Sequence, residues 1–454
     1  MRQRPQEQDK FERRSNFEAV EENLTPEQVQ LEASRCLNCK NPRCVKGCPV
    51  NIQIPDFIKA LKEDHLELAG EIIRNTSMLP SVCGRVCPQE RQCEGNCVLG
   101  IKGEAIAIGA LERFVGDNTP AKEVEIIPSG KRVAIIGSGC AGITAAADLR
   151  KAGHDVTIFE ALHKFGGVLR YGIPPFRLPR KVLDREISNL QNMGVKFEKN
   201  VIVGKSITLQ QLKDDGFDAI FICSGAGLPK MMNIAGENLN GVFSANEFLT
   251  RVNLMQANDK NTATPLKIGK SVAVIGGGNV AMDAARTAVR VGFDTVYIVY
   301  RRTENELPAR LEEIRHAKEE GVVFKFLHAP AEILEKEGYV AGMKFEIMEL
   351  GEPDESGRRS PIGTGRFAIL DVDTVIVALG TGPNPIIQKS ATADGLFFET
   401  DKRGYFIVDE NTRETSIPTI FAGGDVAPVG ASNAINAMGA GKKAAKAINE
   451  FLAK

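Results

Sequence analysis

The stretch Arg132-Val-Ala-Ile-Ile-Gly-Ser-Gly-Cys-Ala-Gly142 decides the fold of this chain. Its β-branched residues predict a short, buried parallel strand, and the glycines that follow predict a sharp turn into a helix. In such a turn the first glycine (Gly137) takes the bend, the second (Gly139) lets the backbone approach a pyrophosphate, and the third lets helix and strand pack closely. The stretch, with Gly142 as its third glycine, therefore predicts a site for a dinucleotide.

A second predicted strand, Asp155-Val-Thr-Ile-Phe159, supports this interpretation because a carboxylate follows it. Glu160 lies 23 residues after Gly137, at the place where a dinucleotide-binding fold carries the acid for a ribose 2′-hydroxyl. The alternative is a glycine turn without a ligand, which leaves the strand, the helix and the acid in register unexplained.

Length and composition exclude several classes of protein. A chain of 454 residues exceeds what one compact core usually holds, and about two to four domains are expected. Lys and Arg (57) balance Asp and Glu (58), which argues against nucleic acid or a membrane surface as a partner. Residues 1–10 lack the apolar core of a signal peptide, and no run of about eighteen apolar residues could span a bilayer. We expect a cytoplasmic protein.

Eight of the ten cysteines lie between Cys36 and Cys97, which points to metal binding. Clustered spacing without a secretion signal favours metal ligands over disulfides. The first set opens with Cys-x2-Cys and ends with Cys48-Pro49, as in bacterial ferredoxins, where the fourth cysteine ligates the other cluster of a pair. Structural zinc is the alternative, but it usually uses two compact cysteine pairs. Two sets of four, Cys36, Cys39, Cys44 and Cys48, and Cys83, Cys87, Cys93 and Cys97, predict two [4Fe–4S] clusters with ligands exchanged between them. Spacing does not decide which cysteine serves which cluster.

The opening motif recurs in the second half of the chain. A strand over 271–275 is followed by Gly276, Gly278, Asn279 and the small residue Ala281, and then by a predicted helix. This pattern predicts a second dinucleotide-binding turn with alanine at its third small position.

The strand that follows this second turn ends on Arg301-Arg302, where the first fold carries Glu160. A carboxylate there would repel a 2′-phosphate, whereas a guanidinium can pair with one. The arginines therefore predict that the second site binds NADP(H). The first site, whose strand ends on an acid, is predicted to bind FAD. Two solvated arginines at a strand end are the alternative.

Two further segments are expected beside the flavin. The loop over 164–175 is dense in glycine and proline, and we expect Gly167 and Arg170 to line the isoalloxazine pocket; a merely rigid turn is the alternative. Near the C-terminus, Gly424 and Asp425 follow a short strand, and Asp425 could hold the ribityl chain or only cap a helix. The N-terminus of a closing helix over 434–451 could face the flavin pyrimidine.

The predicted fold class is α/β, with a helical two-cluster iron–sulfur domain followed by two nested Rossmann-like domains for FAD and NADPH. Polar segments at 117–120 and 254–270 suggest boundaries, and 351–366 reads as a polar hairpin-like excursion. The predicted ranges are 1–128 for the cluster domain, 129–265 and 373–454 for the two parts of the FAD domain, and 266–372 for the NADPH domain.

With these motifs the chain resembles, over nearly its whole length, the family of the NADPH-dependent glutamate synthase small (β) subunit. Similar modules form the N-terminal part of dihydropyrimidine dehydrogenase and the large subunit of NADH-dependent reduced ferredoxin:NADP oxidoreductase. The resemblance implies interlocked clusters and a non-cysteine ligand, Glu112, from the segment Gly109-Ala-Leu-Glu-Arg-Phe114. Spacing alone would have chosen Cys83 instead. The implied ligand sets are Cys36, Cys39, Cys44 and Cys97 for one cluster, and Cys48, Cys87, Cys93 and Glu112 for the other.

The resemblance also implies an activity. NADPH would deliver a hydride to FAD, and single electrons would pass through the clusters to a partner subunit that makes glutamate from glutamine and 2-oxoglutarate. The partner would be the glutamate synthase large subunit or another electron-accepting flavoprotein or ferredoxin, and we expect an oligomer. No side chain need act as acid or base, so no catalytic residue is predicted.

Other interpretations stay open at this point. The chain could be the large subunit of the electron-bifurcating ferredoxin:NADP oxidoreductase (or of sulfide dehydrogenase type), a stand-alone enzyme that uses free ammonia, or a sensor or scaffold that merely binds FAD. Cys140 and Cys223 are interpreted as packing residues. Disulfide-reductase chemistry is disfavoured because no Cys-x-x-Cys follows residue 97.

Overall fold

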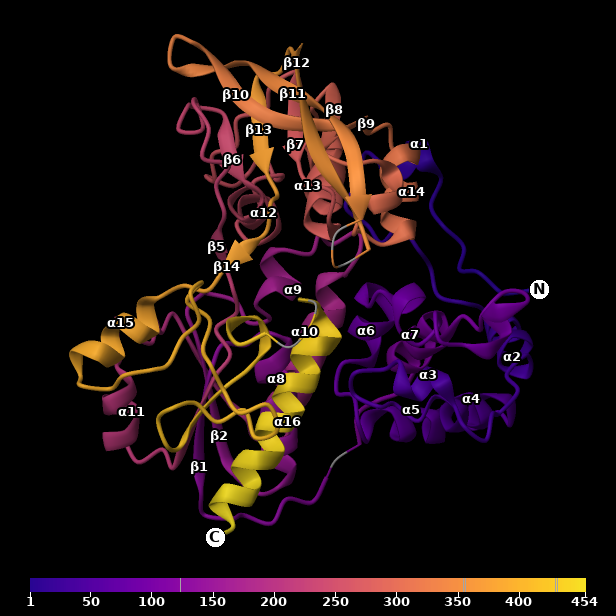
Figure 1. The fold of residues 1–454 in the computed structure, drawn as a ribbon. Helices are drawn as coiled ribbons and strands as arrows, with labels where there is room; N and C mark the ends of the chain where they lie inside the picture. The colour runs from indigo at the N-terminus through magenta and orange to yellow at the C-terminus, as the bar shows by residue number, and fades with distance from the viewer. Residues whose placement is uncertain (123, 354, 356, 429, 431) are drawn as a thin grey trace.

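The computed structural model describes residues 1–122, 124–353, 355, 357–428, 430 and 432–454. The N-terminal quarter of the chain is helical and lies beside two parallel sheets (Figure 1). Its second helix begins as the sequence predicts, because Thr25 and Gln28 form a capping box with Pro26 at the first helical position. The helices of this quarter are α1 Lys10–Arg13, α2 Pro26–Ser34, α3 Arg43–Lys46, α4 Ile54–Lys62, α5 Leu66–Arg74, α6 Pro80–Val86 and α7 Ile108–Asn118, with 3-10 turns η1 Gln89–Arg91 and η2 Val98–Ile101.

The first sheet is parallel, in the order β15-β4-β1-β2-β3. Its central strands consist of apolar residues that are buried on both faces, as expected for a parallel sheet. Helices α8 and α16 pack against each other on one face, and α10 lies beside α8 (Figure 1). The bounds are β1 Arg132–Ile136, β2 Asp155–Glu160, β3 Lys196–Lys199, β4 Ala219–Ile222, β15 Ile420–Ala422, α8 Cys140–Lys151, α10 Arg180–Asn192 and α16 Ala434–Leu452. The strand after residue 419 joins this sheet, so the sheet consists of two separate parts of the chain.

The second sheet is also parallel, in the order β6-β13-β7-β8-β9. Helices α12, α13 and α14 belong to this unit. The bounds are β6 Val242–Ser244, β7 Ser271–Ile275, β8 Thr295–Tyr300, β9 Val323–Phe326, β13 Thr374–Val377, α12 Ala245–Asn253, α13 Asn279–Val291 and α14 Leu311–Glu319.

The second sheet corrects two predicted boundaries. Strand β6 and helix α12 fall in the range 129–265, and β13 falls in 373–454, yet both strands pair within the second sheet. The polar segment 254–270 is therefore a loop inside the second unit. The chain crosses between the two units earlier, where β5 Leu228–Pro229 pairs with β14 Thr381–Gly382.

An antiparallel sheet of three strands, β10-β11-β12, extends from the second unit. The strands are β10 His328–Lys336, β11 Tyr339–Pro353 and β12 Arg359–Leu370. The predicted excursion over 351–366 lies at the β11–β12 end, and its residues 354 and 356 are outside the described part. Shorter elements complete the fold: α9 Val168–Tyr171, α11 Leu209–Asp214, α15 Ile386–Ala393, η3 Glu304–Glu306 and η4 Gly424–Val426.

Buried arginines join the three parts. Arg177, from the loop before α10, pairs with Asp283 of α13 (2.8 Å) and Glu313 of α14 (2.8 Å). Arg310 donates to the backbone oxygen of Arg85 at 2.8 Å, which ties the second unit to the helical part. These contacts set how the sheets face each other. In the described part of the chain, no helix has both the length and the apolar character needed to cross a membrane.

Candidate functional site: two dinucleotide turns and two cysteine sets

The turn after β1 has the shape that a bound pyrophosphate needs. Gly137 has φ +114°, and a Cβ there would lie 2.6 Å from the backbone oxygen of Cys223. A Cβ at Gly142 would lie 2.0 Å from the backbone oxygen of Gly137, so helix and strand are as close as glycine permits. By contrast, no atom of the described chain lies within 4 Å of a Cβ built at Gly139. The open position is the one at which phosphate oxygens approach the backbone, so the turn fits the group.

Glu160 ends β2 directly beside this turn. Its Oε2 accepts hydrogen bonds from the backbone N–H (3.1 Å) and the hydroxyl (2.5 Å) of Ser138, and its Oε1 accepts from the backbone N–H of Leu162 at 2.9 Å. The carboxylate is buried. The strand-end acid and the glycine turn are therefore held together as a ribose site requires, and Ser138 is a contact that the motif alone did not indicate.

The loop over 164–175 lies against the same turn. Gly167 has φ +53°, and a Cβ there would lie 3.0 Å from the Cα of Gly139. Arg170 is buried; it donates from Nε to the backbone oxygen of Phe165 at 2.8 Å and pairs with Asp184 of α10. The observed contacts of Arg170 hold the shape of the loop, and its contact with a flavin stays a prediction.

Gly424 and Asp425 lie next to the start of helix α8, which follows the first glycine turn. Gly424 has φ +71°, and a Cβ there would lie 3.1 Å from the Cβ of Ala141 in the first turn of α8. Asp425 is half-buried, and this burial raises the pKa of its carboxyl. Helix α16 begins nearby at a cap formed by Asn433, whose side chain accepts from the backbone N–H of Asn436.

The turn after β7 repeats the first with one change. Gly276 has φ +143°, and a Cβ there would lie 2.4 Å from the backbone oxygen of Ala378, while the space at Gly278 is open among the described residues. At the third position Ala281 is fully buried with its methyl group. Asn279 begins α13, and its Oδ1 accepts from the backbone N–H of Arg310 at 2.9 Å.

The two arginines after β8 differ in their surroundings. Arg301 is exposed at the strand end. Arg302 is buried, and its Nε donates to the backbone oxygen of Arg359 on β12 at 2.7 Å. Arg301 is therefore the better placed of the two to meet a 2′-phosphate, and both assignments stay predictions.

One cysteine set lines a partly open hollow in the helical part. Apolar residues of α4 and the 98–108 segment complete the walls, and the four thiols are half-buried. Burial raises the pKa of Cys36, and raises that of Cys44 to about 11. Four thiols around one hollow match the donor set of an iron–sulfur cluster. They are the four residues implied for the first cluster, Cys36, Cys39, Cys44 and Cys97.

The second group lies deeper. Cys48, Cys87 and Cys93 are buried, and the charge of Glu112 acts on the pKa of all three thiols. Burial raises the pKa of Glu112 to about 8. Its Oε1 is buried without a hydrogen-bond partner in the described part of the chain. A buried carboxylate oxygen without a hydrogen-bond partner, whose charge acts on three thiols, fits a fourth ligand, so the residues present suit the group.

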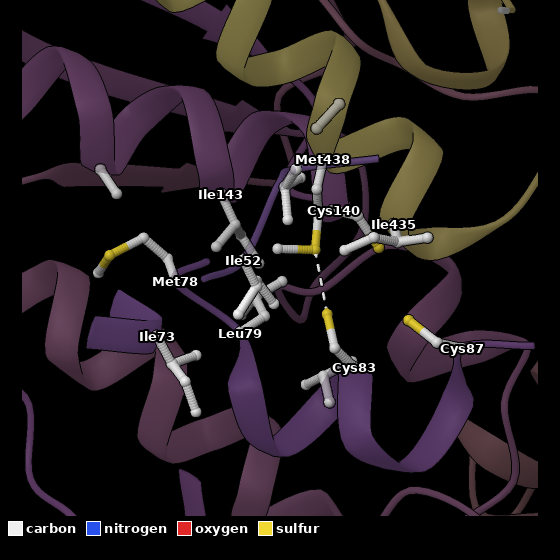
Figure 2. Packing of buried hydrophobic residues seen from close by; sticks show 14 of the residues in the cluster. Ile52, Ile73, Met78, Leu79, Cys83, Cys87, Cys140, Ile143, Ile435 and Met438 are labelled. Carbon is white, nitrogen blue, oxygen red and sulfur yellow. Dashed lines mark hydrogen bonds between the residues drawn. The ribbon is translucent and has the colours of Figure 1, made fainter. Parts of the chain in front are cut away.

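Cys83 lies close to this second group but makes other contacts (Figure 2). Its Sγ lies 3.4 Å from Sδ of Met438 on α16. Cys140 is buried in the same cluster of apolar side chains, and Cys223 lies behind the first turn, with its Sγ 3.4 Å from the backbone oxygen of Gly137.

Comparison with known proteins agrees with both halves of the molecule. Residues 13–124 match the family model of dihydropyrimidine dehydrogenase domain II, 4Fe-4S cluster, and residues 131–441 match that of the pyridine nucleotide-disulphide oxidoreductases. The fold is similar to Mycobacterium tuberculosis FprA in complex with NADPH (TM-score 0.57, 22% identity, 71% of this chain and 85% of that one). It is also similar to thioredoxin reductase from T. acidophilum (TM-score 0.54, 20% identity, 71% and 98%). The chain is thus an oxidoreductase that joins a 4Fe-4S domain to an FAD- and NADP-type fold.

Curated relatives specify the family further. The chain is 37% identical over 457 residues to the glutamate synthase [NADPH] small chain of Escherichia coli (strain K12), which covers 97% of this chain and 95% of that one. It is 39% identical over 438 residues to the NADP(+)-dependent formate dehydrogenase subunit beta of Moorella thermoacetica, of which it spans only 60%. This protein belongs to the glutamate synthase small-chain family of NADPH-dependent flavin and iron–sulfur oxidoreductases. The predicted family, fold class and type of enzyme are confirmed.

Proposed function

We propose that this chain is the NADPH-oxidising subunit of a glutamate synthase and supplies electrons to a partner large subunit. FAD and two [4Fe–4S] clusters, when bound, would convert the hydride of NADPH into single electrons. Two relatives of nearly full matching length, from Halomonas elongata and Azospirillum brasilense, are also glutamate synthase small chains.

One observation about helix α16 carries this proposal. The helix packs beside the first dinucleotide turn and also against the residue that follows Cys48, one of the buried cysteines. On α16, a Cβ at Gly441 would lie 2.3 Å from the backbone oxygen of Ala141, just after the start of α8. A Cβ at Gly439 would lie 3.2 Å from the backbone oxygen of Pro49, which follows Cys48. A sensor or scaffold that merely binds FAD does not require this contact between the two sites.

The chain's own residues would act by binding and orientation. Glu160 would accept the ribose hydroxyls of FAD, and the open backbone at Gly139 would admit its phosphates. Arg301 would pair with the 2′-phosphate of NADPH, whose pyrophosphate would meet the backbone at Gly278. Arg177 would keep the two units in register, since its two carboxylate partners lie in the second unit.

The partner is inferred from the relatives. This chain spans 95% of the Escherichia coli protein that is named a small chain, and small chains from two other organisms match it as well. A large subunit on a separate polypeptide would carry the centre where glutamate forms. The formate dehydrogenase relative is longer, so its additional part has no counterpart in this chain.

The test combines purified holoprotein with the glutamate synthase large subunit from the same source. We expect NADPH oxidation that depends on both glutamine and 2-oxoglutarate and on the presence of both proteins. NADPH:dye reductase activity without any glutamine-dependent turnover in the mixture would remove the glutamate synthase assignment. It would redirect the search to another electron acceptor.

A further inference from the structure

Cys83 is the cysteine of the 36–97 region that the implied ligand sets leave over, and its surroundings are well defined. It lies on α6 with only 1% of its surface exposed. Figure 2 shows its side chain pointing toward Met438 on α16, with the two sulfur atoms 3.4 Å apart. The Ser77 hydroxyl is 4.0 Å from the same sulfur. The thiol is thus buried where the helical part meets the first unit.

Cys83 also stands one helical turn before Cys87, a predicted ligand of the buried cluster. Side chains four residues apart lie on the same face of a helix, and the backbone N–H of Cys87 donates to the oxygen of Cys83 at 3.1 Å. Gln89 Nε2 donates to that oxygen as well, at 3.1 Å. The backbone of Cys83 is therefore held next to Cys87, and Figure 2 shows the two side chains at the same end of α6.

We propose that Cys83 is a positioning residue that donates its S–H to the sulfur of Cys87 once Cys87 is a cluster thiolate. This inference rests on the proposed iron–sulfur function. A thioether is a weak acceptor and a thiolate is a strong, charged one, so the proton of Cys83 favours Cys87 over Met438 when the site is loaded. The bond gains strength because the thiol is buried.

Such a bond has a consequence for the buried cluster. Hydrogen bonds to the sulfurs are among the features that set the reduction potential of a cluster, because they stabilise the more negative, reduced state. Cys83 would thus raise the potential of the cluster that is held by Cys48, Cys87 and Cys93, relative to the same cluster without the bond. Met438, which accepts from the thiol in this structure, would then only pack beside it.

The test is a redox titration of the anaerobically purified holoprotein, followed by EPR spectroscopy, with iron and acid-labile sulfide measured on each sample. Cys83→Ala should retain the iron and sulfide of the parent, shift one cluster signal to a lower midpoint potential and leave the other unchanged. Cys83→Ser should restore most of the potential, because serine keeps an O–H donor. Met438→Leu, the matched packing control, should leave the potential near that of the parent.

Three results would overturn the inference. Loss of iron, or a [3Fe–4S] signal, in Cys83→Ala would make Cys83 a ligand in place of Glu112. An unchanged potential in Cys83→Ala would mean that no such hydrogen bond forms, and an equal shift in Met438→Leu would reduce the effect to packing. A parent protein without iron and sulfide would instead be a failure of the proposed function.

Discussion

The two dinucleotide turns of this molecule share a backbone but differ in two positions. In the first turn the third small residue is Gly142, where a Cβ would collide with a backbone oxygen at 2.0 Å, whereas the second turn accommodates the methyl group of Ala281. Helix α8 is therefore packed more closely on its strand than α13 is. This difference in packing depends on how near each helix lies to its sheet, which the spacing of the glycines alone does not reveal.

The charged residue at the end of the next strand, β2 in the first unit and β8 in the second, differs as well. Glu160 is buried and bonded to Ser138 of its own turn, while Arg301 is exposed to an incoming ligand. We predict that this difference in strand-end charge adapts the same backbone to two cofactors. Four variants, ordered by the size of the expected effect, test how far this comparison holds.

The largest effect is expected from Arg177→Met, because the two turns can cooperate only while their units stay in register. The variant leaves the carboxylate of Asp283 buried without Arg177 and removes one of the two arginine partners of Glu313, which costs about 3–5 kcal/mol. We expect a lower midpoint in urea unfolding and faster proteolysis between the units. Arg315→Met, which removes a half-exposed charge, should cost less than about 1 kcal/mol. Equal loss in both variants would contradict the role of Arg177 as an interdomain contact.

Gly142→Ala should have the next largest effect. Overpacking against backbone costs about 1–3 kcal/mol, and the turn would have to open, so purified protein should contain little FAD. Flavin content by absorbance and the unfolding midpoint are the measurements. A variant with full FAD occupancy would show that the closeness of α8 and β1 is not needed.

Much of this comparison could be predicted from the sequence, since Gly-x-Gly spacing, the strand ends and the capping box at Thr25 are local signals. The assignment of β6 and β13 to the second sheet could not be, because apolar runs of three or four residues fit either parallel sheet equally well. The burial of Arg302 was also missed, since it depends on a hairpin 57 residues further along the chain.

The cysteine sites, too, could be predicted only in part from the sequence. Spacing identified an iron–sulfur region but favoured Cys83, whereas the orphaned oxygen of Glu112 becomes visible only when α7 is packed beside α6. The contact of Cys83 with Met438 joins residues 355 positions apart, and no sequence pattern announces it.

Arg301→Ala tests the role of the positive charge that follows strand β8. Loss of a charge-assisted bond of about 1.5–3 kcal/mol should raise the KM for NADPH roughly tenfold to hundredfold and leave the KM for NADH nearly unchanged. Steady-state dye reduction with both nucleotides measures this. Arg302→Ala serves as the comparison, because its loss should mainly weaken the contact with β12. Unaltered NADPH preference in Arg301→Ala would remove the assignment.

Ala281→Gly should have the smallest effect. The more open second turn needs no glycine there, so the cost should be about 0.5–1 kcal/mol of helix stability, with NADPH binding retained. Thermal unfolding and the KM for NADPH check this. A loss as large as that of Gly142→Ala would mean that the two turns are packed alike.

The most direct test of the account is an anaerobic titration of the purified protein, followed by visible absorbance and EPR. The account predicts a coloured protein whose flavin absorbance is bleached by NADPH and whose two cluster signals then appear, while NADH acts far less effectively. A colourless protein, zinc in place of iron and sulfide, or a flavin that NADH reduces equally well would contradict it.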